Sequence, residues 1–179
     1  CLAQPSSAGL NCPVRSDTSI VLPSRIDDVT GDTLRKARRC LEMMDLGCAE
    51  TVIADLVPGD LDANTLGAFL IVRGDLASLN ENFADAENAY QNVLEIPDLH
   101  TQIRQSATTR LGILYMRQGR YVFLLRHGSE TGCDDRNAEM GFLEASAYFE
   151  LDDFPNALEA INRALQAQAA AGNIIPETW

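Results

Sequence analysis

The residues best suited to metal binding or nucleophilic chemistry are five cysteines and two histidines. A structural zinc site usually needs a close Cys-x-x-Cys pair together with further cysteines or histidines. No such pair occurs in the sequence, and neither His100 nor His127 is grouped with a cysteine. The sequence therefore predicts no metal site and no cofactor.

A more specific pattern is an apolar run that starts at Tyr121 and is followed by Arg126, His127 and Gly128. It resembles the signature of the histidine phosphatases, in which a strand delivers a nucleophilic histidine and an arginine that binds phosphate. That chemistry also requires a second histidine later in the chain, and no histidine follows His127. We therefore interpret the motif as the end of a short helix, where cations interact favourably with the helix dipole, and we expect no enzyme activity.

The cysteines have a second interpretation, as lipid and disulfide sites. Cys1 has no methionine before it, and residues 2–9 contain the Pro, Ser and Gly typical of the tether that follows the lipidated cysteine of a bacterial lipoprotein. The alternative is that Cys1 is simply where a longer chain was cut. The lipoprotein interpretation predicts a periplasmic or outer-membrane-anchored protein, and the alternative predicts a cytoplasmic one.

Four cysteines remain for disulfides in an oxidising compartment. Cys40 and Cys48 flank the turn of a predicted helical hairpin, so they could face each other across it. Cys12 and Cys133 are then the leftover pair, although four cysteines allow three connectivities. In the cytosol, all five would instead be small buried residues or inert surface thiols.

The composition indicates a helical protein. Of its 179 residues, 46% are hydrophobic, which is enough for a core, and only 6% are aromatic, which disfavours β-sheets. No apolar run is long enough to span a membrane, so a lipid at Cys1 is the only membrane attachment that we expect. The net charge of −12 repels a phosphate backbone, so nucleic acid is not a predicted partner.

The strongest pattern in the sequence is a duplicated helix. Residues 82–94 and 153–165 share an aromatic residue, small residues and a leucine at helical spacing, with a constant offset of 71. The matched pairs are Phe83 and Phe154, Ala86 and Ala157, Ala89 and Ala160, and Leu94 and Leu165. The offset is close to two periods of about 34 residues, which is typical of stacked helical hairpins.

We predict an arm over residues 1–29 and a repeat domain over residues 30–179. The first hairpin has an N-cap at Asp32, a helix closed by Gly47, and a return helix over residues 49–57 that ends before Pro58. The return segment of the third hairpin is expected to be irregular. The predicted hairpins cover residues 30–63, 67–100, 105–137 and 138–171, and a further helix begins at 176–179.

These repeats resemble the tetratricopeptide repeat family over about residues 30–179. The matching residues are Gly74, Phe83, Ala86, Tyr90 and Pro97 in the second repeat, Leu111, Gly112, Tyr115, Gly119 and Tyr121 in the third, and Ala145, Tyr148, Phe154, Ala157 and Ala164 in the fourth. The resemblance implies an all-α, right-handed superhelical solenoid that binds another protein and is not an enzyme. Trp179 falls where a fifth repeat would begin, so we expect a longer protein.

The resemblance also implies a binding groove on the first helices of the hairpins. By repeat position, its predicted residues are Arg35, Arg38, Ile71, Val72, Asp75, Arg110, Met116, Arg117, Phe142 and Phe149. An apolar strip flanked by arginines suits an amphipathic peptide with some acidic residues. The lysine and asparagine clamp with which some relatives bind chaperone C-termini does not occur at these positions. A purely structural oligomerisation module is the remaining alternative.

Overall fold

The computed structural model describes residues 28–132 and 137–170, where all regular secondary structure is helical. The all-α prediction is therefore confirmed for this part of the chain. The helices are α1 (Asp28–Glu42), α2 (Leu46–Ile53), α3 (Ala63–Leu79), α4 (Phe83–Glu95), α5 (Thr101–Arg117), α6 (Tyr121–Glu130), α7 (Ala138–Glu150) and α8 (Phe154–Ala170), with a 3₁₀ turn, η1 (Pro58–Asp60).

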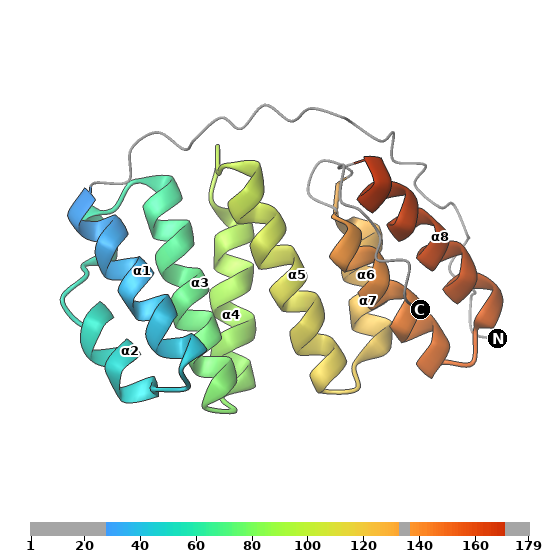
Figure 1. Cartoon of the computed structure of the whole chain (residues 1–179), viewed down its shortest axis with the longest axis horizontal. Helices are drawn as coiled ribbons and strands as arrows, with labels where there is room; N and C mark the ends of the chain where they lie inside the picture. Colours follow the sequence, from blue (N-terminus) through green and yellow to red (C-terminus); the bar gives the residue numbers. More distant parts are fainter. Residues whose placement is uncertain (1–27, 133–136, 171–179) are drawn as a thin grey trace.

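Consecutive helices pair as hairpins, and the hairpins follow one another in sequence order (Figure 1). The pairs are α1 with α2, α3 with α4, α5 with α6, and α7 with α8. The first helices also contact one another, α1 with α3, α3 with α5 and α5 with α7. This arrangement gives the molecule one continuous side built from first helices.

All four hairpins turn in the same way. The residues at the turns with a positive φ are Met44 (58°), Glu81 (60°), Gly119 (66°) and Asp152 (59°). The next backbone N–H in each turn donates to a carbonyl five residues earlier, always at 2.9 Å: Asp45 to Cys40, Asn82 to Ala77, Arg120 to Tyr115, and Asp153 to Tyr148. This is the Schellman motif, in which a left-handed residue ends a helix and satisfies its last carbonyls.

The turns also place the duplicated helices in register. Glu81 and Asp152 are 71 residues apart, the same offset as the duplicated helices α4 and α8. Residues 71 apart therefore occupy equivalent places in the second and fourth hairpins. The repeat length is not uniform, because Gly119 lies 38 residues after Glu81 and 33 before Asp152.

Polar side chains start most of the helices. Asp45, Asp62, Asn82 and Asn137 each accept a hydrogen bond from a backbone N–H in the first turn of the following helix, at 2.8 to 3.4 Å. Such caps satisfy N–H groups that have no partner within the helix. The side chain of His100 caps α5, where Nδ1 accepts from the backbone N–H of Gln102 at 3.3 Å.

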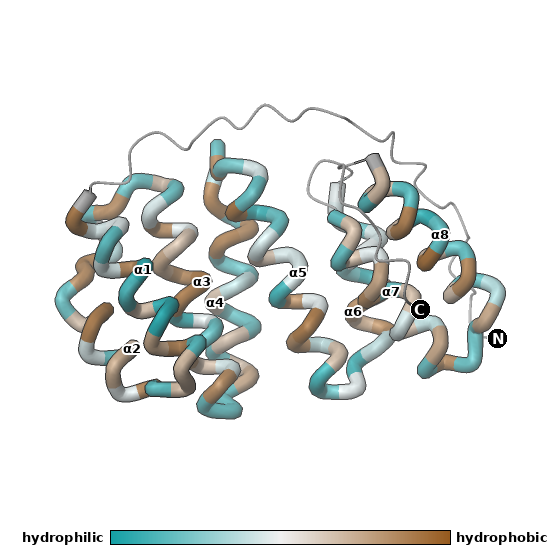
Figure 2. The backbone as a smooth tube through the Cα atoms, in the orientation of Figure 1, coloured by the Kyte–Doolittle hydropathy of each residue, from teal (hydrophilic) through white to brown (hydrophobic). Residues whose placement is uncertain are grey.

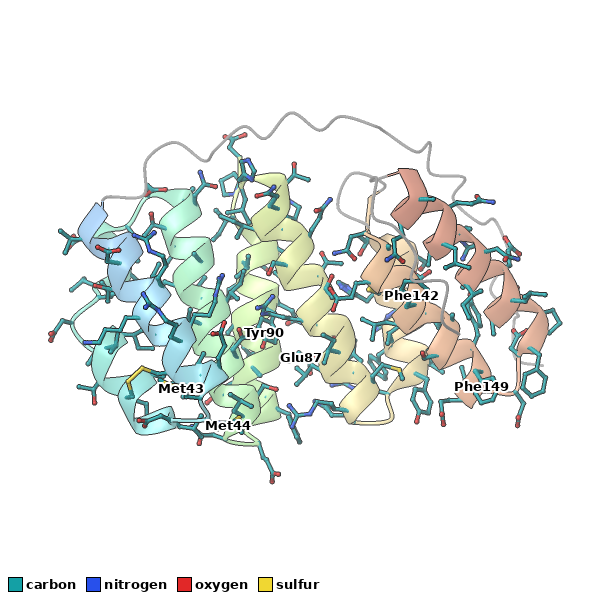
Figure 3. The ribbon with its side chains drawn as sticks, in the orientation of Figure 1. Met43, Met44, Glu87, Tyr90, Phe142 and Phe149 are labelled. Atoms are coloured by element: carbon teal, nitrogen blue, oxygen red, sulfur yellow. A yellow bond between two sulfur atoms is a disulfide. The ribbon has the colours of Figure 1, made fainter. Side chains whose placement is uncertain are left out.

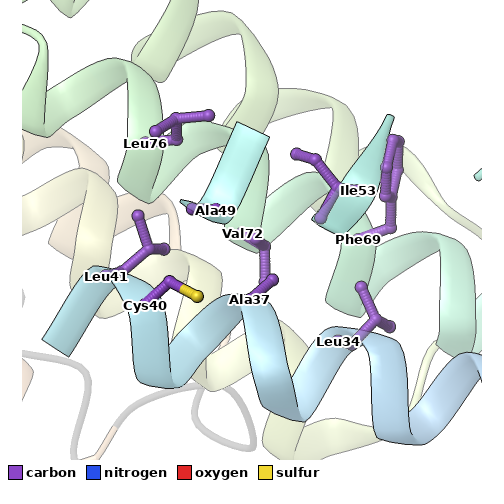
Figure 4. Close-up of a cluster of buried hydrophobic side chains, with 9 residues drawn as sticks. All are labelled: Leu34, Ala37, Cys40, Leu41, Ala49, Ile53, Phe69, Val72 and Leu76. Carbon is purple, nitrogen blue, oxygen red and sulfur yellow. The ribbon is translucent and has the colours of Figure 1, made fainter. Parts of the chain in front are cut away.

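The core runs along the stack as a series of buried clusters. The first cluster joins the first two hairpins and includes Leu34, Ala37, Ile53, Phe69 and Val72 (Figure 4). A second cluster lies between the middle and last hairpins, and a third lies between α3, α4 and α5. Hydropathy alternates accordingly along the helices (Figure 2). Each hairpin thus shares its core with its neighbours, as expected for stacked units.

Several predicted boundaries in the first hairpin are wrong. Helix α1 begins at Asp28, so Asp32 lies inside it, and its end is set by the left-handed Met44 rather than by Gly47. Gly47 instead lies in the first turn of α2, which ends at Ile53. Val57 is extended because it precedes Pro58, and such residues avoid the helical region.

The return segment of the third hairpin is also more regular than predicted. It is the helix α6, which begins at Tyr121 and buries Leu124 and Gly128. Gly119 ends α5 two residues earlier, so Tyr121 belongs to the second helix of this hairpin.

Some predictions lie outside the described residues. They concern the arm over residues 1–27, the possible lipid at Cys1, the cysteines Cys12 and Cys133, and the start of a further helix at residues 176–179. Within residues 28–132 and 137–170, no helix combines the length and the apolar character that crossing a membrane requires.

Candidate functional site

A hollow of about 530 Å³ lies on the side of the molecule built from first helices. Its lining residues are Arg38, Leu41 and Glu42 from α1, Asp75, Ser78 and Leu79 from α3, Tyr90 from α4, Thr109, Arg110 and Ile113 from α5, and Glu139 from α7. Each of the four hairpins therefore contributes to one surface. Arg38, Asp75 and Arg110 are the predicted groove residues that the structure brings together there.

A hydrogen-bonded network of side chains lies in the middle of this hollow. Asp75 Oδ1 accepts a hydrogen bond from the hydroxyl of Tyr90 at 2.7 Å, and the same carboxylate accepts from Arg110 Nε at 2.8 and 3.0 Å. Arg110 also donates to Ser106 one turn earlier in α5. The network links α3, α4 and α5, so it fixes two successive hairpins relative to each other.

Some charged side chains of the hollow are paired with another side chain of the described residues, and others are not. Burial, and secondarily the charge of Asp75, raises the pKa of the Tyr90 hydroxyl, which therefore remains a donor. Arg110 is neutralised by Asp75. Arg38, Glu42 and Glu139 have no ion pair within the described residues, so they remain available at the rim.

A glycine makes room for the aromatic residue at the centre of the network. A Cβ atom at Gly74 would lie within 2.9 Å of three atoms of the Tyr90 ring. Contacts that close do not occur between real side chains, so α3 and α4 approach here only because residue 74 lacks a side chain.

Two predicted groove residues are buried instead. Ile71 is 2% exposed and packs with Val93, Leu99 and Ala107, because α5 covers that side of α3. Val72 is 1% exposed and belongs to the cluster that joins the first two hairpins. The prediction that these residues line a groove is wrong, since α3 is covered on both sides within the stack.

Three further predicted residues do not line the hollow, although Arg117 contacts Ser78, which does. Arg117 donates to Ser78 Oγ at 2.7 Å, and its guanidinium lies over the ring of Phe83. Met116 is half-buried against the central cluster. Arg35 pairs with Asp32 on the exposed surface of α1. None of these three lines the hollow.

Phe142 and Phe149 lie on α7, beyond the hollow (Figure 3). Phe149 is 60% exposed, and its ring meets that of Phe154 edge-on at a centroid distance of 5.5 Å. They belong to a different surface, at the α8 end of the molecule.

A disulfide joins Cys40 in α1 to Cys48 in α2, with their Cα atoms 5.7 Å apart. It lies across the first hairpin turn, where the sequence placed this pair. Cys40 is buried in the first cluster, so the crosslink ties the short α2 directly to the core.

The Arg126-His127-Gly128 motif lies within the helix α6. His127 Nε2 must donate to the backbone carbonyl of Thr108, at 3.1 Å, because a carbonyl oxygen only accepts. Burial lowers the pKa of His127, and Arg126 lies over the ring of Phe123. Arg126 and His127 line a hollow of about 320 Å³ together with Glu95 and Glu130, whose carboxylates would oppose the binding of a phosphate group. These contacts suit a structural role.

A second polar network, which was not predicted from the sequence, joins α4 to α5 and to the turn that follows α5. Glu87 in α4 accepts from the hydroxyl of Tyr115 at 3.0 Å and pairs with Arg120 at 2.6 Å. The Arg120 guanidinium also lies over the rings of Tyr115 and Phe123, at 4.7 and 4.3 Å. The one signal was that Glu87 and Arg120 carry opposite charges about one repeat apart.

The described residues offer no candidate metal centre. No three histidine, cysteine or carboxylate side chains come together in residues 28–132 and 137–170 in a way that could hold an ion. The predicted absence of a cofactor stays a prediction.

Comparison with models of known protein families finds no match to this chain, and comparison with curated proteins finds none either. The class of the protein therefore follows from its own geometry. That class is an all-α stack of helical hairpins with a polar hollow along its first helices.

Proposed function

We propose that the protein is a non-enzymatic scaffold of the tetratricopeptide repeat type, which binds a segment of another protein along the hollow of its first helices. Four hairpins with one shared turn geometry and the close approach of Gly74 to Tyr90 support this assignment. In such a protein the hairpins would form a right-handed superhelical solenoid, and the hollow would lie on its concave side.

The observation that carries the proposal is that the hollow combines side chains held by internal hydrogen bonds with exposed side chains that a partner could contact. Asp75, Tyr90 and Arg110 are held by one another, so they lose little freedom when a partner binds. Arg38, Glu42 and Glu139 have no ion pair within the described residues, and Ile113 is an apolar contact that is 37% exposed. The partner segment is therefore amphipathic, with an acidic residue for Arg38, basic residues for Glu42 and Glu139, and an apolar residue for Ile113.

A location in a bacterial envelope fits the crosslink between Cys40 and Cys48, because disulfides persist mainly in oxidising compartments. Lipid at Cys1 would anchor the scaffold to a membrane surface. Mass spectrometry of the native protein tests both points. A lipidated Cys1 and an intact Cys40–Cys48 peptide are expected, and free thiols at all cysteines would exclude the envelope location.

The binding function is tested with substitutions that leave the internal network intact. The variant Arg38→Glu/Ile113→Asp changes exposed side chains of the hollow. The control Val57→Asp changes a residue that is 57% exposed and does not line the hollow. Partners that co-purify with the native protein should be lost from the hollow variant and retained by the control. Equal recovery with both variants would show that the hollow is not the binding site.

A further inference from the structure

Among the described residues, a group of large exposed apolar side chains lies on the last hairpin, α7 with α8, which forms one end of the stack (Figure 1). We call it the terminal face, and it consists of Phe149 (60% exposed), Leu151 (42%), Phe154 (54%), Leu158 (63%) and Ile161 (40%). Single exposed apolar residues are common on proteins, but a contiguous group of large ones usually marks an interaction site.

Helix α8 is apolar along two different stripes. Ala157, Ala160 and Ala164 are buried in the hairpin, where α8 packs against α7. Phe154, Leu158 and Ile161 follow the spacing i, i+4 and i+7, so they form a second stripe that no described helix covers.

The second hairpin indicates what covers such a stripe. By the offset of 71, the equivalents of Phe154, Leu158 and Ile161 on α4 are Phe83, Glu87 and Tyr90. The buried stripes match in part: Ala86 and Val93 on α4 are buried, as are their equivalents Ala157 and Ala164, whereas Ala89, the equivalent of the buried Ala160, is half-buried.

On α4 these positions are covered by α5 and by the turn that follows it. Arg117 lies over the Phe83 ring at 5.3 Å, while Tyr115 and Arg120 bind Glu87. Tyr90 is only 2% exposed, because its ring lies between Gly74 of its own hairpin and the buried residues of α5. Within the stack, the equivalent face of α4 is thus covered by one helix, α5, with arginines at and just after its C-terminal end.

The terminal face differs from its internal counterpart in polarity. Leu158 replaces the anionic Glu87, and Ile161 replaces the hydrogen-bonded Tyr90. An occupant therefore needs an apolar side chain where α5 presents polar groups to Glu87. Burial of these side chains would supply most of the binding free energy.

The rim of the terminal face is acidic. Glu150 and Asp152 lie at the turn between α7 and α8, and Glu159 is exposed on α8. Arg163 is the only cation that α8 contributes within the described residues, and it pairs with Glu159 and Glu144. A complementary occupant is therefore apolar along one stripe and basic along its flanks.

The size of the face also favours a single helix. At 40% to 63% exposure, its five side chains offer on the order of 400 Å², since a fully exposed aromatic side chain presents roughly 150–250 Å². A stable interface between two whole domains buries about 800 Å² on each partner. A second copy of this acidic chain would also bring acidic rims together.

From these observations we infer that the terminal face binds an amphipathic, basic α-helix of a partner polypeptide, packed on α8 as α5 packs on α4. This surface is separate from the hollow of the first helices. Binding at one of them does not require the other.

The test uses a fluorescent peptide with the sequence of residues 101–120, which carries four arginines and no acidic residue, and with Tyr115→Leu, because the hydroxyl of Tyr115 donates to Glu87 on α4 and an apolar side chain is needed opposite Leu158. Its fluorescence anisotropy is measured against the full chain. We expect saturable micromolar binding that weakens at least tenfold in Leu158→Asp.

Two variants of the chain serve as controls. Val122→Asp, at a residue 67% exposed on α6, and Arg38→Glu/Ile113→Asp, in the hollow, should bind the peptide like the original chain. A peptide with Arg117→Glu/Arg120→Glu should bind more weakly.

Four results would overturn the inference. They are an absence of binding, equal binding by Leu158→Asp, a concentration-dependent dimer that Leu158→Asp abolishes, and binding that occurs only after residues 171–179 are removed. The third would assign the face to a second copy, and the fourth to the chain's own C-terminal segment. Circular dichroism of each variant establishes that it is folded, and the exposure of residue 158 makes that outcome expected.

Discussion

At the scale of single residues, a few polar side chains determine how neighbouring hairpins meet. Asp75 connects Tyr90 in its own hairpin with Arg110 in the next, and Glu87 does the same for Tyr115 and Arg120. These groups are partly buried, so each depends on its partner more than an exposed ion pair would. The polar networks therefore specify register, while the apolar clusters supply most of the stability.

Removing Asp75 should leave Arg110 and Tyr90 without their shared acceptor. We expect Asp75→Ala to lower the free energy of unfolding by about 1–3 kcal/mol. The double variant Asp75→Ala/Arg110→Met should regain part of that loss, because no unpaired cation remains. Urea denaturation measures both, with the exposed Glu50→Ala as the control, for which a change below about 0.5 kcal/mol is expected. The single variant Arg110→Met completes the comparison. If the loss in the double variant equalled the sum of the losses in Asp75→Ala and Arg110→Met, the proposed coupling would be contradicted.

His127 should make stability depend on pH. Burial lowers its pKa in the folded state below the ordinary value of 6.5, so the unfolded chain binds more protons as the pH falls below 6.5. The stability that depends on neutral His127 is present above pH 6.5 and is lost at lower pH. Over that range the free energy of unfolding falls by at most about 1.4 kcal/mol per pH unit.

The comparison is between the original chain and His127→Gln, whose amide can still donate to the Thr108 carbonyl. Unfolding free energies between pH 7 and pH 5 should fall less steeply in the variant. Parallel curves for the two proteins would mean that His127 is not responsible.

At the scale of elements, the turns between paired helices are the most uniform feature of the molecule. Each uses a left-handed residue, but only Gly119 is a glycine, and the other positions carry Met44, Glu81 and Asp152. A residue with a side chain is strained by about 1–2 kcal/mol in this conformation. The helices therefore end where packing of the hairpin requires, even where the local sequence opposes it.

This strain predicts opposite effects at equivalent turns. Glu81→Gly should raise the free energy of unfolding by about 0.5–1 kcal/mol, and Gly119→Ala should lower it by about 1 kcal/mol. Gly59→Ala is a matched control, because Gly59 has no positive φ and a Cβ there would contact nothing within 4 Å. Thermal denaturation would contradict the interpretation if Glu81→Gly were destabilising.

At the scale of the whole molecule, stability is distributed along the stack. The clusters join neighbouring hairpins, and within the described residues the crosslink between Cys40 and Cys48 adds a constraint at the α1 end. In such an arrangement, local changes should weaken one end without unfolding the rest.

Removal of the disulfide tests this expectation. Its sequence separation of 8 residues corresponds to a stabilisation of about 2.5 kcal/mol from loop entropy. Cys40→Ala/Cys48→Ala should lose about this amount, and dithiothreitol should then destabilise the variant less than the original chain. Hydrogen exchange should accelerate in α1 and α2 while α5 stays protected. Uniform acceleration throughout the molecule would show that the stack unfolds as one unit.

The hairpin architecture was largely predictable from the sequence, whereas the candidate site was predictable only in part. The duplicated helices and the turn near residue 119 carry local signals, such as helical spacing and glycine. Met44 carries no such signal, so the first turn was misplaced, although Cys40 and Cys48 were recognised as flanking it. The return segment of the third hairpin was predicted to be irregular, although Arg126, His127 and Gly128 were correctly interpreted as lying near the end of a short helix, which is α6.

The sequence by itself determined that the chain is helical and repetitive, because apolar spacing and caps act within a few residues. Only the tertiary structure decided which side of each helix stays exposed. Ile71 and Phe142 are equivalent by the offset of 71, yet Ile71 is buried because α5 covers it, whereas Phe142 lies on the last hairpin and is only half-buried. Periodicity identifies an apolar stripe, and its burial depends on the neighbouring helix that packs against it.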